Sequence, residues 1–292
     1  MKIAIHIGAH TTDGDHLLKS LLKDKERLLN SGVLVPGPGK YRRHLREALA
    51  YAEDVDLTEN QAQEILDTIL EGATPDRLVL SAPNFLGFPK LAVENNRLYP
   101  HAHSRMETLM GILPAKEKEL HLSICNPVVL LPMLIKQGTA KTTSHAILHS
   151  DPRQLKWSEL IRRLREQCPD NHLVVWCSED TPLIWPEIML SVAGLAANAT
   201  LLQGGDDILA EIMSPDGLQR YQAYMKARAP MSQQQQSAVA AAFLDKFSIP
   251  GALEQEIDIP GWTDALVEEA TNAYEEDLAL IMQMPDVDMI LP

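Results

Sequence analysis

The residues best suited to chemistry stand close together in one loop near the N-terminus, which begins at Gly8. Four of them carry imidazole or carboxylate groups, the side chains that divalent metals accept in proteins: His10, Asp13, Asp15 and His16. Adjacent loop positions rarely direct all their side chains at one centre, and Asp13 can instead cap the helix that follows. We therefore predict no resident metal, with these four residues as the alternative metal site.

The segments on either side of this loop are needed to position it. The apolar, β-branched run at residues 3–7 predicts a buried strand, and leucines recur at helical spacing over residues 17–22. A strand, a glycine-bearing loop and a helix N-terminus together form the architecture that cradles phosphate groups. This loop contains no lysine, however, and its two carboxylates would repel an anion.

Other candidate groups lie at the ends of later strands. Glu179 follows the run at residues 172–177, where α/β sheets place ligand-binding loops, and it could act as a general base towards a substrate hydroxyl. The alternative is that the Asp-Thr-Pro after it merely begins a helix. Cys125 and Cys177 also end apolar runs, but small buried cysteines are far more common than reactive ones.

The pattern of apolar residues predicts a three-layer α/β fold with a mostly parallel sheet of four or five strands. The expected strands are residues 3–7, 33–35, 77–81, 120–124 and 172–177. The last hundred residues read as wholly helical, and a helix is expected from about residue 15 to residue 30. The polar stretch at residues 139–152 is a candidate surface loop or lid. We predict one domain over residues 1–292, with a core at 1–200 and a helical extension at 201–292.

Bulk composition restricts the possible partners. The net charge of −14 opposes broad contact with nucleic acid or an anionic membrane surface. No stretch approaches about 20 uninterrupted apolar residues, and no signal peptide is visible. Three widely spaced cysteines suit reduced thiols in a cytoplasm. The expected partner is a small molecule or a protein.

The first loop and its strand are similar to a known family. Ile-His-Ile-Gly-Ala-His, at residues 5–10, resembles the opening motif of the bacterial sulfotransferases, which have a P-loop-like α/β fold. Gly-Val-Leu-Val-Pro, at residues 32–36, resembles the turn that follows the family's first helix. The resemblance implies a site for an adenosine phosphosulfate donor, with His10 as a catalytic candidate. The positions it assigns to the donor are Gly8, His10, Thr11, Thr12, Gly14, Ser81 and Cys125.

The chain departs from this family at the residues that hold the donor's charge. Thr11 stands in place of the loop lysine, and Cys125 in place of an arginine at the end of the third long strand. Each lost charge-assisted contact to a phosphate costs about 1.5–3 kcal/mol. We therefore expect no cofactor, and the phosphosulfate donor only if the site still works.

Two classes of function remain open. The first choice is a sulfotransferase-like protein with a degenerate donor site, non-catalytic or repurposed, for example as an interaction module with an acidic cleft. The alternative is an active sulfotransferase or other group transferase that acts on a hydroxyl, with Glu179 as base. The cleft above the loop distinguishes the two classes of function. If side chains such as Met133 or His16 fill it, no ligand can enter.

Overall fold

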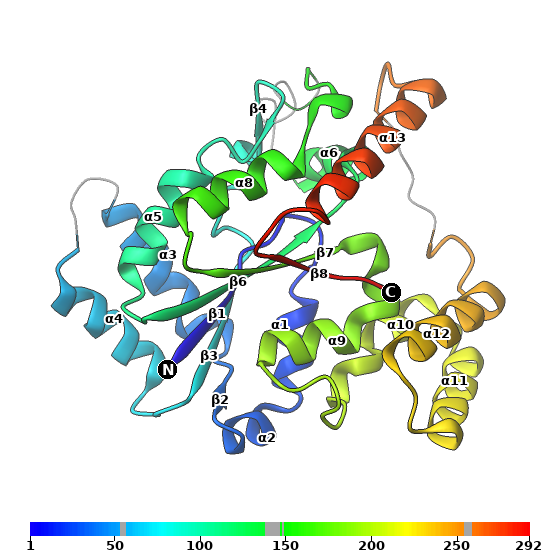
Figure 1. Cartoon of the computed structure of the whole chain (residues 1–292), viewed down its shortest axis with the longest axis horizontal. Helices are drawn as coiled ribbons and strands as arrows, with labels where there is room; N and C mark the ends of the chain where they lie inside the picture. The colour runs from blue at the N-terminus through cyan, green and yellow to red at the C-terminus, as the bar shows by residue number, and fades with distance from the viewer. Residues whose placement is uncertain (53–56, 138–146, 148, 254–258) are drawn as a thin grey trace.

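A six-stranded sheet forms the centre of the molecule (Figure 1). The computed structural model describes residues 1–52, 57–137, 147, 149–253 and 259–292; most of the stretch considered as a lid, at residues 139–152, lies outside them. The strand order is β2-β3-β1-β6-β7-β8, and every neighbouring pair is parallel. The strands are β1 (Lys2–His6), β2 (Val33–Leu34), β3 (Arg77–Ser81), β6 (Glu117–Ile124), β7 (His172–Cys177) and β8 (Val287–Ile290).

Helices cover both faces of this sheet, so the fold is the expected three-layer α/β structure (Figure 1). One face packs against α3 (Arg42–Tyr51), α4 (Glu59–Leu70), α5 (Ala102–Ile112), α6 (Pro127–Gln137), α8 (Trp157–Gln167) and α13 (Asp264–Ile281). The other packs against α1 (His16–Leu22), α2 (Lys25–Asn30) and α9 (Thr181–Ala193). A third small core joins α10 (Asp207–Ile212), α11 (Pro215–Arg228) and α12 (Gln233–Phe247) beside α9. A short hairpin, β4 (Val93–Glu94) with β5 (Arg97–Leu98), precedes α5.

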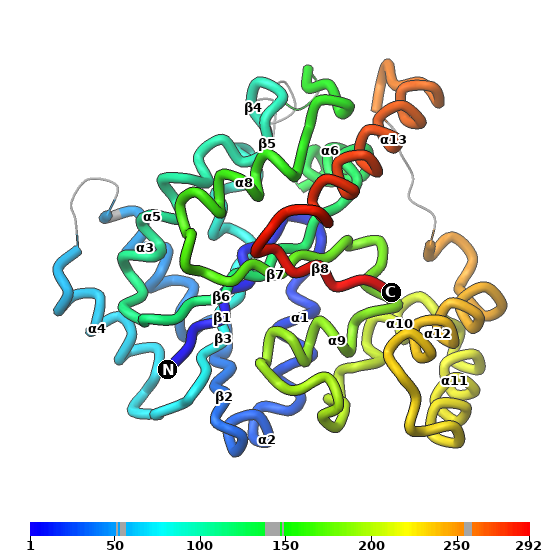
Figure 2. Tube along the Cα trace, viewed as in Figure 1, coloured from blue at the N-terminus to red at the C-terminus, as the bar shows by residue number. Residues whose placement is uncertain are grey.

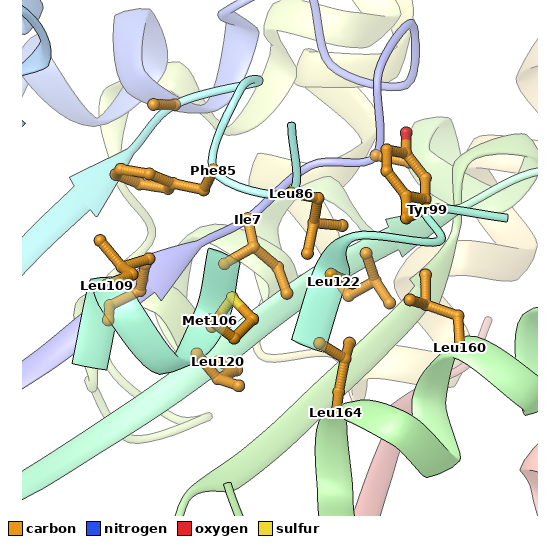
Figure 3. Packing of buried hydrophobic residues seen from close by; sticks show 14 of the residues in the cluster. Ile7, Phe85, Leu86, Tyr99, Met106, Leu109, Leu120, Leu122, Leu160 and Leu164 are labelled. Atoms are coloured by element: carbon orange, nitrogen blue, oxygen red, sulfur yellow. The ribbon is translucent and has the colours of Figure 1, made fainter. Parts of the chain in front are cut away.

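Alternation along the strands explains why both faces are apolar. In β1 and the residue after it, Ile3, Ile5 and Ile7 enter the larger core, while Ala4 enters the smaller one. Side chains in a strand point to opposite faces in turn, so a strand covered on both sides reads as one continuous apolar run. Figure 3 shows Ile7 among leucines from β6, α5 and α8 on the larger side.

The prediction of a wholly helical last hundred residues is wrong at the C-terminus. After α13 the chain returns to the sheet, and β8 pairs with β7 as a sixth strand (Figure 2). The four-residue run, Val-Asp-Met-Ile, is too short to identify as a strand without its partner. Ile290 is 7% exposed because it packs against the smaller core. Tertiary pairing, not local pattern, makes this segment a strand.

The single helix expected over residues 15–30 is two helices. The break falls between α1 and α2, at Asp24, whose carboxylate is buried and accepts a hydrogen bond from the backbone amide of Gln203. The Asp24 carboxylate thus binds the backbone of a segment that is distant in the sequence, and it does not lie on an exposed helix face. In the described part of the chain, no helix is long and apolar enough to cross a lipid bilayer.

The strand order creates a crevice next to β1. The connection after β1 leads to α1 on the smaller-core face, whereas the connection after β3 leads towards α5 on the larger-core face. Open α/β sheets bind ligands where neighbouring connections diverge in this way, outside the carboxyl ends of the strands. The topology therefore makes the loop after β1 the first place to look for a site.

Candidate functional site

A cavity of about 300 Å³ lies at this crevice, and we call it the loop cavity. Most of its wall comes from the loop after β1, and the rest from the ends of β1 and β3, the segment after β3, and the last residue of α6. The lining residues are His6, Gly8, Ala9, His10, Thr11, Asp13, Gly14, Asp15, Ser81, Pro83, Asn84, Pro89 and Gln137. Neither Met133 nor His16 lines the cavity, so the space above the loop is open.

Asp13 acts within the loop as a helix cap. Its Oδ1 accepts a hydrogen bond from the backbone amide of Leu17 at 2.8 Å. The neighbouring Thr12 hydroxyl donates to the carbonyl of Ala9 at 2.9 Å, which closes the loop on itself. The backbone amide of Leu17, near the start of α1, therefore already donates to a carboxylate and is not free to donate to a bound anion.

Asp15 forms an ion pair that the sequence did not reveal. Its two oxygens accept hydrogen bonds from the guanidinium of Arg42 at 2.9 and 2.6 Å. The hydrogen bonds from Arg42 hold the pKa of the Asp15 carboxyl below its ordinary value. A carboxylate of the loop itself therefore neutralises the Arg42 guanidinium, while the ammonium of Lys19 donates to the carbonyl of Gly14 at 3.3 Å.

His10 is buried, and both of its ring nitrogens are engaged. Nδ1 lies 3.0 Å from the hydroxyl of Tyr99, and Nε2 lies 3.1 Å from Oδ1 of Asn84. Oδ1 of Asn84 is an acceptor, so Nε2–H donates to it; Nδ1 of the neutral ring then accepts from the Tyr99 hydroxyl, which itself accepts from the His10 backbone amide. Burial lowers the pKa of His10. This neutral ring holds the loop in place and has no free nitrogen to offer a substrate.

His6 and Ser81 form the floor of the loop cavity. Nδ1 of His6 lies 2.9 Å from the hydroxyl of Ser81, while Nε2 is buried without a partner among the described residues. Burial lowers the pKa of His6, so the ring is neutral near pH 7. The Thr11 hydroxyl, also on the cavity wall, likewise lacks a partner within the described chain. These two groups are the buried side-chain polar atoms of the cavity wall that a ligand could satisfy.

Glu179 and Cys125 do not line the loop cavity. Oε1 of Glu179 accepts a hydrogen bond from the amide of Asn126 at 2.6 Å, and Oε2 lies 3.4 Å from the Tyr274 hydroxyl. Although the residue as a whole is exposed, desolvation around its carboxyl raises the pKa. Cys125 is 3% exposed, and burial raises its thiol pKa well above the ordinary value. Glu179, the candidate base, and Cys125, a candidate position for the phosphosulfate donor, therefore both lie outside the loop cavity.

The four residues considered as metal ligands do not converge. His16 Nδ1 lies 3.3 Å from a carboxylate oxygen of Glu211, on α10, and the other three have the partners described above. Within the described residues, no group of three or more histidine, cysteine or acidic side chains could hold a metal ion.

Four lining or supporting residues escaped the reading of the sequence: His6, Arg42, Asn84 and Gln137. His6 belongs to an apolar strand, and the only sequence signal for a role in the site is its position at the carboxyl end of that strand. Arg42 begins a helix that is distant in the chain, so its approach to Asp15 depends on how α3 packs. A comparison with protein-family models and with curated proteins found no match for the chain.

Proposed function

We propose that this chain is a sulfotransferase-like protein that no longer takes the phosphosulfate donor and uses the loop cavity to bind a small polar molecule. The carrying observation is the hydrogen bond from the Leu17 amide to Asp13. A phosphate or sulfate group in the loop would have to displace this carboxylate and would then lie beside it. Like charges at such short range are strongly unfavourable in a partly buried site.

The charges around the loop favour a neutral or cationic ligand. Asp13 and Asp15 both line the cavity, and Arg42 is already paired with Asp15. The buried groups of the wall without a partner in the described part of the chain are Nε2 of His6 and the Thr11 hydroxyl, and the Gln137 side chain also lines the cavity. A volume of about 300 Å³ is at the lower end of the range for ligand pockets. These features fit a small molecule rich in hydroxyl, amide or amino groups.

Calorimetry with adenosine 3′-phosphate 5′-phosphosulfate, and with the corresponding 3′,5′-bisphosphate, tests the loss of donor binding. We expect no saturable binding of either nucleotide up to about 1 mM, which corresponds to a binding free energy weaker than about −4 kcal/mol. Saturable binding near 1 μM would overturn the proposal and favour an active transferase.

A matched variant checks that the loop chemistry is the cause. The triple change Thr11→Lys, Asp13→Gly and Asp15→Thr restores the lysine and the small residues of the pattern that the loop resembles. It removes two carboxylates and leaves Arg42 without its carboxylate partner. We expect this variant to bind the bisphosphate at least about tenfold more tightly than the unaltered chain. Equal, undetectable binding by both would show that features outside the loop exclude the nucleotide.

A further inference from the structure

One carboxylate on the wall of the loop cavity has no cation bound to it. Oδ1 of Asp13 accepts a hydrogen bond from the Leu17 amide, whereas Oδ2 has no hydrogen-bond or ion-pair partner among the described residues. Asp15, the other acid of the lining, is held by two nitrogens of the Arg42 guanidinium. The half-buried Asp13 therefore presents an unpaired negative charge to a ligand.

The other cations near the loop lie outside the cavity. Lys19 is exposed, and its ammonium donates to the carbonyl of Gly14 at 3.3 Å. Lys90 follows the lining residue Pro89 but lines a different cavity, between α3 and α5. Among the described residues, those that line the loop cavity include two carboxylates and no lysine or arginine.

The floor of the cavity adds neutral polar groups that are buried and without a partner. His6 is 2% exposed, and neither its Nε2 nor the hydroxyl of Thr11 has a hydrogen-bond partner in the described part of the chain. Burial lowers the pKa of His6, and the largest opposing effect comes from the carboxylate of Asp13, so these two side chains lie near each other. Leaving a buried polar atom without a partner is costly, and a ligand that hydrogen-bonds it offsets that cost.

We infer that the ligand of the loop cavity is a small primary amine that carries hydroxyl groups; this inference rests on the function proposed above. The ammonium group binds Oδ2 of Asp13, and the hydroxyls bind Nε2 of His6 and the hydroxyl of Thr11. A hydroxyl suits a histidine nitrogen in either tautomer, because it can both donate and accept.

Three related classes of molecule fit the cavity less well. A neutral polyol leaves the Asp13 carboxylate unpaired, and an alkylammonium without hydroxyls leaves the polar floor unpaired. An organic anion would meet the Asp13 carboxylate at short range. The class of ligand thus follows from a carboxylate and a neutral polar floor in one cavity.

A titration followed by backbone amide NMR shifts compares four probes of similar size: 2-amino-1,3-propanediol, glycerol, isopropylammonium and glycerate. The aminodiol is expected to shift the amides of residues 8–15 saturably. Glycerol and isopropylammonium should bind at least about tenfold more weakly, and glycerate not at all. Absence of saturable aminodiol binding, or equal affinity for glycerol, overturns the inference.

Matched variants locate the ammonium group. Asp13→Asn removes the charge but keeps an oxygen that accepts from the Leu17 amide, so the helix start is retained. It should weaken aminodiol binding about tenfold and leave glycerol unchanged. Asp245→Asn, at an exposed acid of α12 outside the cavity, should change neither. Equal aminodiol affinity in the two variants would refute the role of Asp13.

The hydroxyl contacts have a separate test. Thr11→Val removes the hydroxyl with little change of shape and should weaken the aminodiol about threefold. The ring nitrogen signals of His6 should shift when the aminodiol is added to the parent chain. Unchanged affinity in Thr11→Val together with unchanged His6 signals would refute the polar floor as the hydroxyl site.

The outcomes separate this inference from the function proposed above. If glycerol binds the loop cavity as well as the aminodiol does, the amine assignment fails, while a small polar ligand in the cavity stands. Only tight binding of the phosphosulfate donor to the unaltered chain overturns the proposed function itself.

Discussion

Arg42 bridges the loop after β1 and the end of β3. Its Nη1 and Nη2 donate to the two carboxylate oxygens of Asp15 at 2.9 and 2.6 Å, and its Nε donates to the carbonyl of Ser81 at 2.9 Å. A bidentate pair of this kind fixes direction as well as distance. The first residue of α3 therefore fastens the acidic loop over the sheet.

Acid should weaken this bridge. The folded-state pKa of Asp15 lies below its ordinary value of 3.8, so the contribution is full above pH 3.8 and is lost as pH falls through the folded pKa. Because both side chains are partly exposed, the contribution is about 0.5–1 kcal/mol. Urea unfolding of the parent and of Asp15→Asn should give stabilities that differ near pH 6 and converge towards pH 2.5.

A double-mutant cycle supplies the control for this pair. Asp15→Ala and Arg42→Ala should together cost less than the sum of the single changes, because each removes the same interaction. Strict additivity would mean that the pair contributes nothing to stability in solution.

Gly194 ends α9 against a buried arginine. Its φ is +67°, and a Cβ there would lie 2.8 Å from Cδ of Arg77, whose guanidinium binds Glu119 and the Val192 carbonyl. Gly194→Ala should cost about 2–4 kcal/mol, the sum of left-handed backbone strain and displacement of the arginine. Gly72→Ala is the comparison, since its φ of +79° is similar but nothing lies within 4 Å. Chemical denaturation that gave equal losses would rule out the contact with Arg77.

The C-terminal strand should contribute to stability through one side chain. Ile290 is 7% exposed, whereas its neighbour Leu291 is 47% exposed. We expect Ile290→Ala to lower the free energy of unfolding by about 2 kcal/mol and Leu291→Ala by less than about 0.5 kcal/mol. Similar small effects in thermal and urea melts would show that β8 is not anchored as described.

The cysteines should be unreactive in the folded protein. Cys125, Cys168 and Cys177 are each less than 5% exposed, and burial raises their thiol pKa values, that of Cys177 to about 12. The thiolate is the reactive form, so iodoacetamide at pH 8 should label none of them quickly in native protein and all three in denaturant. Rapid labelling of native Cys125 or Cys177 would contradict the burial described above.

Local patterns predicted most of the elements because their signals lie within a few residues. The strands at Arg77–Ser81 and His172–Cys177 follow the predicted bounds. Both strands depend on a short apolar, β-branched run, which is a local signal. The strand β8 had no such signal, because its stability comes from pairing with β7, over a hundred residues away in the chain.

The sequence by itself determined what the first loop contains: no lysine, two carboxylates and a glycine-rich turn between a strand and a helix. Only the tertiary structure decided how those groups are used. It assigned Asp13 to the helix start and Asp15 to Arg42, and it left the loop cavity open. The physical reason is that a charge acts on whatever lies within a few ångströms, and packing of distant helices decides which group that is.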